Sequence, residues 1–211
     1  MQNAYTDTGV TAGTTYHYQV SAVNSVGEGS RSNQVSATPT SGSQRVYFQD
    51  FDGTSTGWTK SGGSTDLWRL GSGCLGKVSG TKSLQYNRGD SACDYNLGAR
   101  TTGWAQSPVI DLSGKGSATL RFSHAWETES YAGGAYDIMR IQVSSNSGST
   151  WTTLQQWDSR NANQLSFQQV AYDVSPYISS GFRVRVFFDS VDGTSNVFRG
   201  WHVDDVEVVA G

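Results

Sequence analysis

The sequence is short of the residues that mark several protein classes. Its 211 residues include only 2 Cys, 2 Met, 3 Pro and 3 His. With no CxxC pair and no histidine beside a cysteine, neither a zinc site nor a thioredoxin-like motif is indicated. No apolar stretch approaches the roughly 20 residues that span a bilayer, so we expect no membrane partner.

Long runs of one charge and the motifs of common enzymes are also missing. Lys and Arg number 15 against 18 Asp and Glu, and no basic run marks a nucleic-acid surface. There is no GxSxG elbow, no HExxH sequence and no glycine-rich loop leading into a helix. We predict no catalytic residue and no nucleic-acid partner. The first residues lack the segments of a signal peptide, which we expect upstream of this sequence if the protein has one.

Glycine and aromatic residues, in contrast, are abundant, and the composition favours strands and turns. The chain has 25 Gly, 10 Tyr, 8 Phe and 7 Trp. In the run 182–188, Arg183, Arg185 and Phe187 alternate with apolar residues, as in a sheet with one buried face. Ten segments read as strands: 45–51, 67–71, 82–87, 103–112, 118–129, 136–146, 152–157, 167–174, 182–190 and 200–209. The sequence predicts an all-β protein.

The first 40 residues form a separate region. The alternating runs 15–23 and 33–38 flank the turn-rich NSVGEG, which predicts a β-hairpin. GTTYHYQVSAVN and SNQVSATP resemble the last strands of a fibronectin type III domain. The resemblance implies a partial module over 1–40, with the chain beginning inside it, and a polar linker over 41–45.

Residues 46–210 are expected to form one β-sandwich. Five blocks in sequence order carry a resemblance: DFDGTSTGW, GWAQSPVIDLSGKGSATLRFSHAWETE, YDIMRIQVSSNSGSTWTTL, VAYDVSPYISSGFRVRVFFDS and GWHVDDVEV. Together they resemble the MAM-like jelly-roll domains appended to secreted bacterial peptidases and other hydrolases. The resemblance implies a jelly roll, a catalytic domain upstream in the same protein, and a monomeric module.

Paired aspartates near both ends of this region raise the question of a metal. In jelly rolls the first and last strands often pair, which would gather Asp50, Asp52, Asp204 and Asp205. Carboxylate and carbonyl oxygens at about 2.3 to 2.6 Å are the ligands of Ca²⁺. We predict a structural calcium site there. The alternative is that Asp50, Asp52 and Asp204 are solvated and that Asp205 only accepts hydrogen bonds.

A second acidic group surrounds the glycine-rich loop of WETESYAGGAYD. It is a second candidate cation site, with a solvated acidic rim as the alternative, and its members are Glu127, Glu129, Asp137, Asp189 and Asp192. Glu127 and Glu129 are two residues apart on an expected strand, about 7 Å by strand rise. Because this spacing overlaps that of glycosidase carboxyl pairs, a small jelly-roll glycosidase is a third, less favoured function.

The tryptophans exceed what one core needs, so some of them are candidates for binding sugar rings. The candidates near loops are Trp68, Trp104, Trp126, Tyr131 and Tyr136, although core packing is the default for each. Trp58, Trp151 and Trp201 are expected to be buried. His17, His124 and His202 lie in strands and are expected to be structural.

Cys74 and Cys93 are compatible with a disulfide or with two free thiols, and we predict the disulfide, which implies secretion. The predicted function is a non-catalytic accessory module that holds a secreted hydrolase on a polysaccharide or protein polymer. A spacer that binds nothing is the alternative.

Overall fold

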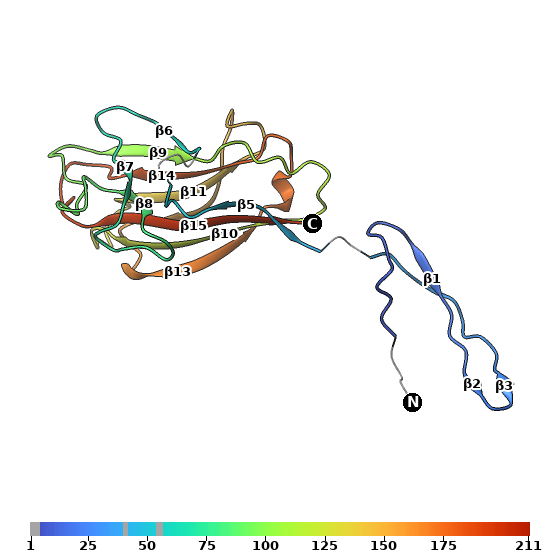
Figure 1. Ribbon diagram of the computed structural model, residues 1–211. Helices are drawn as coiled ribbons and strands as arrows, with labels where there is room; N and C mark the ends of the chain where they lie inside the picture. Colours follow the sequence, from blue (N-terminus) through green and yellow to red (C-terminus); the bar gives the residue numbers. More distant parts are fainter. Residues whose placement is uncertain (1–4, 40–41, 54–56) are drawn as a thin grey trace. The chain divides into compact units, whose positions relative to one another are not determined.

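A computed structural model describes residues 5–39, 42–53 and 57–211 (Figure 1). The chain divides into two compact units, with the boundary between Ser43 and Gln44. The first unit contains two short antiparallel pairs, β1 (Tyr16–Tyr18) with β4 (Val35–Ala37) and β2 (Val23–Asn24) with β3 (Gly27–Glu28). The predicted hairpin is therefore confirmed, while its membership of a fibronectin type III domain stays a prediction.

The second unit is a sandwich of two antiparallel sheets, as the sequence predicts. The six-stranded sheet has the order β13-β10-β15-β8-β7, with β5 also paired to β15. Its strands are β5 (Gln44–Gln49), β7 (Trp68–Gly71), β8 (Ser83–Tyr86), β10 (Ala118–Glu127), β13 (Gln164–Asp173) and β15 (Gly200–Ala210). The five-stranded sheet has the order β12-β11-β14-β9-β6. Its strands are β6 (Thr59–Lys60), β9 (Thr102–Gln106), β11 (Ile138–Ser144), β12 (Thr152–Trp157) and β14 (Arg183–Asp189).

The core lies between the sheets and follows the period of two along each strand. In β14, Val184, Val186 and Phe188 are fully buried, whereas the residues between them are partly exposed. Aromatic rings fill the centre, where Trp68 lies edge-on to Trp201 at 5.7 Å between centroids. A single turn of 3₁₀ helix, Ser175–Tyr177, follows β13, and its second residue is a proline. The structure thus confirms the jelly-roll β-sandwich.

Strand β15 joins three other strands. It pairs with β10 on one side, and its other side pairs first with β8 (Trp201 opposite Tyr86) and then with β5 (Val206 opposite Gln49). The first and last strands of the unit therefore meet, as expected. The change of partner falls next to Asp205, a non-glycine residue with φ of 50°, and the pairing with β10 shifts register there.

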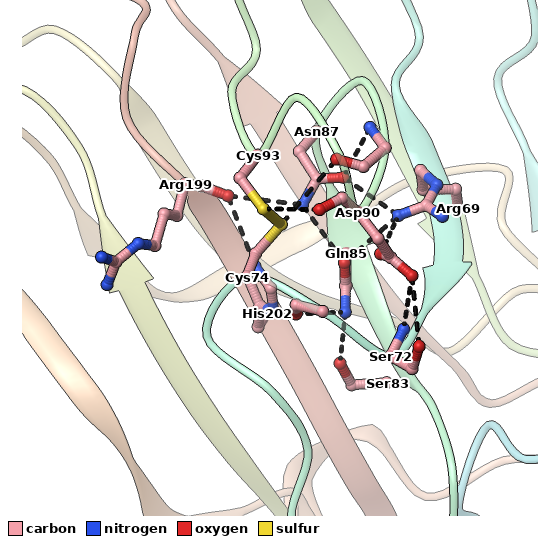
Figure 2. A network of polar contacts seen from close by, with 12 residues as sticks. Arg69, Ser72, Cys74, Ser83, Gln85, Asn87, Asp90, Cys93, Arg199 and His202 are labelled. Carbon is pink, nitrogen blue, oxygen red and sulfur yellow. Dashed lines mark hydrogen bonds and ion pairs between the residues drawn. A yellow bond between two sulfur atoms is a disulfide. The ribbon is translucent and has the colours of Figure 1, made fainter.

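The predicted disulfide is present and covers β8. Cys74 and Cys93 are bonded, with 5.4 Å between their Cα atoms. Figure 2 shows the polar network beneath them, in which the Arg69 guanidinium donates hydrogen bonds to Gln85, Asn87 and Asp90. All four residues of β8 are buried. No helix among the described residues is long and apolar enough to cross a membrane.

Candidate functional site

Asp204 is the buried carboxylate of the last strand, and its partners are backbone amides. It is fully buried, and burial raises its pKa to about 6. Its Oδ2 accepts hydrogen bonds from the backbone N–H of Val78 at 2.7 Å and Ser79 at 3.3 Å, and its Oδ1 accepts one from Asp205 at 2.9 Å. The carboxylate therefore anchors the loop that precedes β8.

The other three predicted calcium ligands lie around the same loop. Asp52 Oδ1 accepts hydrogen bonds from the backbone N–H of Thr81 and of Lys82, and these donors lower its pKa. A Cβ at Gly80, where φ is 56°, would overlap Asp52 Oδ2, so only glycine fits this close approach. Asp205 accepts a hydrogen bond from the Ser79 hydroxyl at 2.5 Å. Asp50 Oδ1 accepts one from the backbone N–H of Asp52 at 3.2 Å.

These aspartates share a loop, but the donor set does not fit a cation. Oδ1 of Asp52 and both oxygens of Asp204 already accept hydrogen bonds from N–H donors, whose partial positive charges occupy the place of a metal ion. The part of the chain that the structure describes contains no group of three or more Asp, Glu, His or Cys side chains arranged to hold a metal. Calcium binding therefore stays a prediction.

The second acidic group contains the buried carboxylate of Asp137 and two carboxylates that pair with arginines. Asp137 is almost fully buried, and its Oδ2 accepts hydrogen bonds from the Tyr95 hydroxyl at 2.5 Å and from the Glu129 backbone at 2.9 Å. Its Oδ1 is buried without a hydrogen-bond partner. Burial raises the pKa of Asp137 to about 7, and the charges of Glu129 and Asp192 add to the rise. This orphaned oxygen is the one feature of either acidic group that suits a cation.

Two of the other four carboxylates in this group have arginine partners. Asp189 forms a bidentate pair with Arg100, at 2.8 and 2.5 Å. Glu127 lies 3.4 Å from Arg199. Strand β10 ends at Glu127, so the predicted sharing of a strand face by Glu127 and Glu129 is wrong, and the glycosidase hypothesis loses its geometric basis.

The five aromatic candidates do not form one platform. Trp68 and Trp126 are only 1% and 5% exposed, so their assignment to a sugar-binding surface is wrong. Both belong to the core, because strands β7 and β10 turn these rings toward the facing sheet. Tyr131, at 52% exposure, and Tyr136 form an edge-on pair in the loop before β11. Trp104 alone lies on the outer face of the five-stranded sheet.

That outer face gathers polar and aromatic side chains in two rows, which the strand register sets. One row runs through Gln156, Arg140, Phe187 and Trp104, and the next through Thr153, Gln142, Arg185 and Gln106. Trp151 extends over the second row, with its ring 4.2 Å from the Arg185 guanidinium. We call Trp104, Gln106, Arg140, Gln142, Trp151, Arg183, Arg185 and Phe187 the Trp/Arg face.

Contacts between neighbours hold the side chains of the Trp/Arg face in place. Arg185 Nε donates to Gln142 Oε1 at 2.9 Å, and Arg140 Nε donates to Gln156 Oε1 at 2.8 Å. The Arg140 guanidinium also lies 5.5 Å from the Phe187 ring. These side chains are already ordered before any ligand binds. Binding on this face would therefore cost less side-chain rotamer entropy than binding to freely mobile surface side chains.

Trp151 is not buried, so the prediction from the sequence is wrong at this position. Trp151 is partly exposed because the loop after β11 folds back on the sheet, and a Cβ at Gly148 would lie 3.3 Å from the indole. Arg140 and Arg185 are also missed as site residues. The alternation in 182–188 indicates an outward face for Arg185, but only the register shows which rows meet across four strands.

The fold can now be compared with solved structures. The K1 cleaved adhesin domain of Lys-gingipain from Porphyromonas gingivalis W83 matches with a TM-score of 0.51 and 18% identity, over 78% of this chain and 98% of that domain. The chain shares its fold with an adhesin domain. The K3 adhesin domain of the same protein matches with a TM-score of 0.49 and 18% identity, over 80% of this chain and all of that one.

A further match is TmCBM61, solved in complex with β-1,4-galactotriose, with a TM-score of 0.48 and 13% identity, over 77% of this chain and 99% of that one. No protein-family model and no curated protein matches the chain. At 18% identity the likeness to the K1 adhesin domain concerns the fold alone, and the side chains of this chain must carry any conclusion about a ligand.

The histidines of the sandwich offer no accessible acid or base. Burial lowers the pKa of both His124 and His202 to about 4, so they are neutral at pH 7. His124 Nδ1 accepts a hydrogen bond from Trp201 Nε1 at 3.3 Å within an aromatic cluster. His202 lies in the network under the disulfide shown in Figure 2. His17 lies in β1 of the first unit, where its Nδ1 contacts Gln34 at 3.0 Å.

Proposed function

We propose that the second unit is a non-catalytic binding module for a polymeric carbohydrate and that the Trp/Arg face is its binding surface. The observation that carries the proposal is the alignment of Trp104, Phe187 and Arg140 in one row, with Trp151 over the next. These side chains are partly exposed on a regular sheet, where core packing does not account for them.

Sheet geometry suits this task. A strand face presents side chains every second residue, about 7 Å apart, and neighbouring strands lie about 4.8 Å apart. Aromatic rings in such an array can stack on successive sugar rings, while the partly exposed Arg185 side chain supplies polar contacts to hydroxyl groups. The adhesin domain of the same fold offers a precedent for an attachment role.

The experiment is retention of the full chain on a panel of insoluble polysaccharides and proteins, followed by titration calorimetry on the best ligand. We expect at least one polysaccharide to retain the protein and Trp104→Ala to weaken binding by about tenfold, which is about 1.4 kcal/mol. Tyr131→Ala, in the loop before β11, is the matched aromatic control and should leave affinity unchanged. If folded protein is retained by none of the polymers, the spacer function is the better account.

Several finer features belong to this proposal. The resemblance to MAM-like modules supports a place beside a hydrolase domain in one secreted protein, with the first unit as part of a fibronectin type III module. The disulfide between Cys74 and Cys93 supports an oxidising compartment. Calcium is proposed at the second acidic group on the orphaned oxygen of Asp137 alone, because the described residues contain no preformed set of three metal-ligating side chains there either.

A further inference from the structure

The Trp/Arg face carries three arginines, and their charges are unopposed. Arg140, Arg183 and Arg185 point outward from two adjacent strands. Seven ion pairs occur among the described residues, and none of them includes any of these three. The only carboxylate in register on the same face of β14, that of Asp189, is already paired with Arg100. The face therefore has a net positive charge within a chain whose net charge is −3.

The terminal nitrogens of Arg140 and Arg185 have no hydrogen-bond acceptor among the described residues. Arg140 and Arg185 each donate through Nε to a glutamine, and this fixes the plane of the guanidinium. Arg183 donates through Nη1 to the Ser107 carbonyl at 3.2 Å. A guanidinium has five N–H donors, and the outer pair matches a carboxylate or sulfate group in a bidentate manner. The glutamines thus orient two guanidinium groups that no carboxylate of the described residues pairs with.

Partial burial makes this arrangement costly without an anion. Burial lowers the pKa of Arg185 to about 10, which still leaves it fully charged at pH 7. Trp151, stacked on the same guanidinium, removes water from one of its sides. A charged group that is partly desolvated and unpaired gains more from an incoming anion than a fully hydrated one does.

We propose that the ligand of the Trp/Arg face is an anionic polysaccharide, whose acidic groups pair with Arg140 and Arg185 while its sugar rings stack on Trp104 and Trp151. The inference rests on the proposed function and narrows its ligand class. Aromatic rings beside the guanidinium groups favour a glycan over a polymer that offers charge alone. The shared chemistry is a carboxylate of a uronic acid or a sulfate ester.

The test compares polymers that differ only in charge. Titration calorimetry of the full chain would use polygalacturonate against its methyl-esterified form, and a sulfated galactan against its desulfated, uncharged form, at 50 and 500 mM NaCl. We expect at least one acidic polymer to bind about tenfold or more tightly than its neutralised or desulfated form, and high salt to weaken that binding. The preferred pair identifies the acidic group as carboxylate or sulfate.

Variants tie the effect to the face. Arg140→Gln and Arg185→Gln should each weaken binding of the acidic polymer by about tenfold, because each removes a charged hydrogen-bond donor. They should leave binding of its neutralised form unchanged. The matched control is Arg121→Gln in β10 of the other sheet, 3.6 Å from Glu207, which should have no effect. Thermal melts confirm that each variant is folded.

The outcomes separate the two proposals. Equal affinity for charged and neutralised polymers, with Trp104→Ala weakening both, overturns the anionic ligand and leaves the binding module intact. Failure to bind any polysaccharide overturns both. Binding of poly-glutamate or single-stranded DNA as tightly as the acidic glycan shows that charge alone is recognised, and this also overturns the anionic-polysaccharide assignment.

Discussion

Asp204 and Asp137 are both buried carboxylates, but they differ in how many of their oxygens accept hydrogen bonds. Asp204 has backbone donors on both oxygens, whereas Asp137 has donors on one oxygen only. The sequence predicts that one of the adjacent pair Asp204 and Asp205 turns inward, because strand residues alternate. It does not show which one, since the irregular backbone at Asp205 resets the alternation. A positive φ at a non-glycine residue leaves little trace in the sequence.

Replacing Asp204 tests its role as the anchor of the loop at Val78 and Ser79. We expect Asp204→Ala to lower the free energy of unfolding by about 1 to 3 kcal/mol, because two backbone N–H groups lose their acceptor. Urea unfolding at pH 7 measures this. Asp205→Ala removes one hydroxyl contact at a more exposed site and should cost less; equal losses would contradict an anchoring role specific to Asp204.

The raised pKa of Asp137 predicts a pH dependence of stability. Protonation is favoured in the folded state, so the contribution of Asp137 is greatest below about pH 4 and falls as pH rises to about 7. A shift of this size corresponds to up to about 4 kcal/mol. We expect the free energy of unfolding of Asp137→Asn, relative to the wild type, to increase between pH 4 and pH 7.

Measuring the difference between the two proteins is necessary, because His124 and His202 act in the opposite direction. Their lowered pKa values make stability rise with pH between about 4 and 6.5 in both proteins. Urea unfolding at intervals of one pH unit gives the two curves. Parallel curves over this range would show that Asp137 ionises without penalty.

At the scale of elements, all ten predicted segments coincide with strands, because nearly all have period-two apolar patterns or dense aromatic content. The sequence patterns do not predict two features. Strand β6 is only two residues long and is not among the predicted segments. Strand β8 is predicted, but its burial on both faces is not, because it contains the polar residues Ser83 and Gln85. The predicted strand 103–112 is regular only as far as Gln106; Ser107 still hydrogen-bonds to Val184 of β14, partly through its hydroxyl, and Ile110 forms an isolated bridge with Phe182 beyond Pro108. Burial of a polar strand requires a cover, and the segment around Cys74 supplies it, because the carbonyls of Gly73 and Gly76 accept hydrogen bonds from the side chains of Gln85 and Ser83.

Removing the disulfide tests the cover. The bridge closes a loop with a sequence separation of 19 residues, for which chain entropy predicts a stabilisation of about 3 kcal/mol. We expect the Cys74→Ser, Cys93→Ser double variant to lose that amount in urea unfolding. The amide protons of β8 should also exchange faster, since Gln85 and Asn87 become accessible to water. Unchanged exchange in β8 would show that the loop stays closed without the bridge.

At the scale of the whole molecule, the sequence predicts a β-sandwich preceded by a hairpin, and the structure contains both. The positions of the aromatic side chains are not predicted as well. The same aromatic residue types occur in the core and on the surface, so residue type does not separate the two. Trp126 is buried and Trp104 is partly exposed because their rings lie on different faces of their sheets. Pairing partners decide this, and they are distant in sequence.

Calcium is best tested on the full chain. If an ion completes the second acidic group, calcium at 1 mM against a chelator should raise the melting temperature by about 5 °C, as for a ligand well above its Kd. Asp137→Asn should abolish the rise, and Asp52→Asn should not, because Asp52 already has backbone donors. A melting temperature that does not respond to calcium or chelator would remove the metal from both groups.

The position of β15 has a consequence for biosynthesis. Strands β5, β8 and β10 all pair with β15, whose eleven residues are the last of the sandwich to be translated. A growing chain therefore exposes three incomplete strand edges until Gly200–Ala210 leaves the ribosome. Because closing such distant pairs is slow, we expect the sandwich to fold only after β15 has left the ribosome, and its open edges to favour chaperone binding until then.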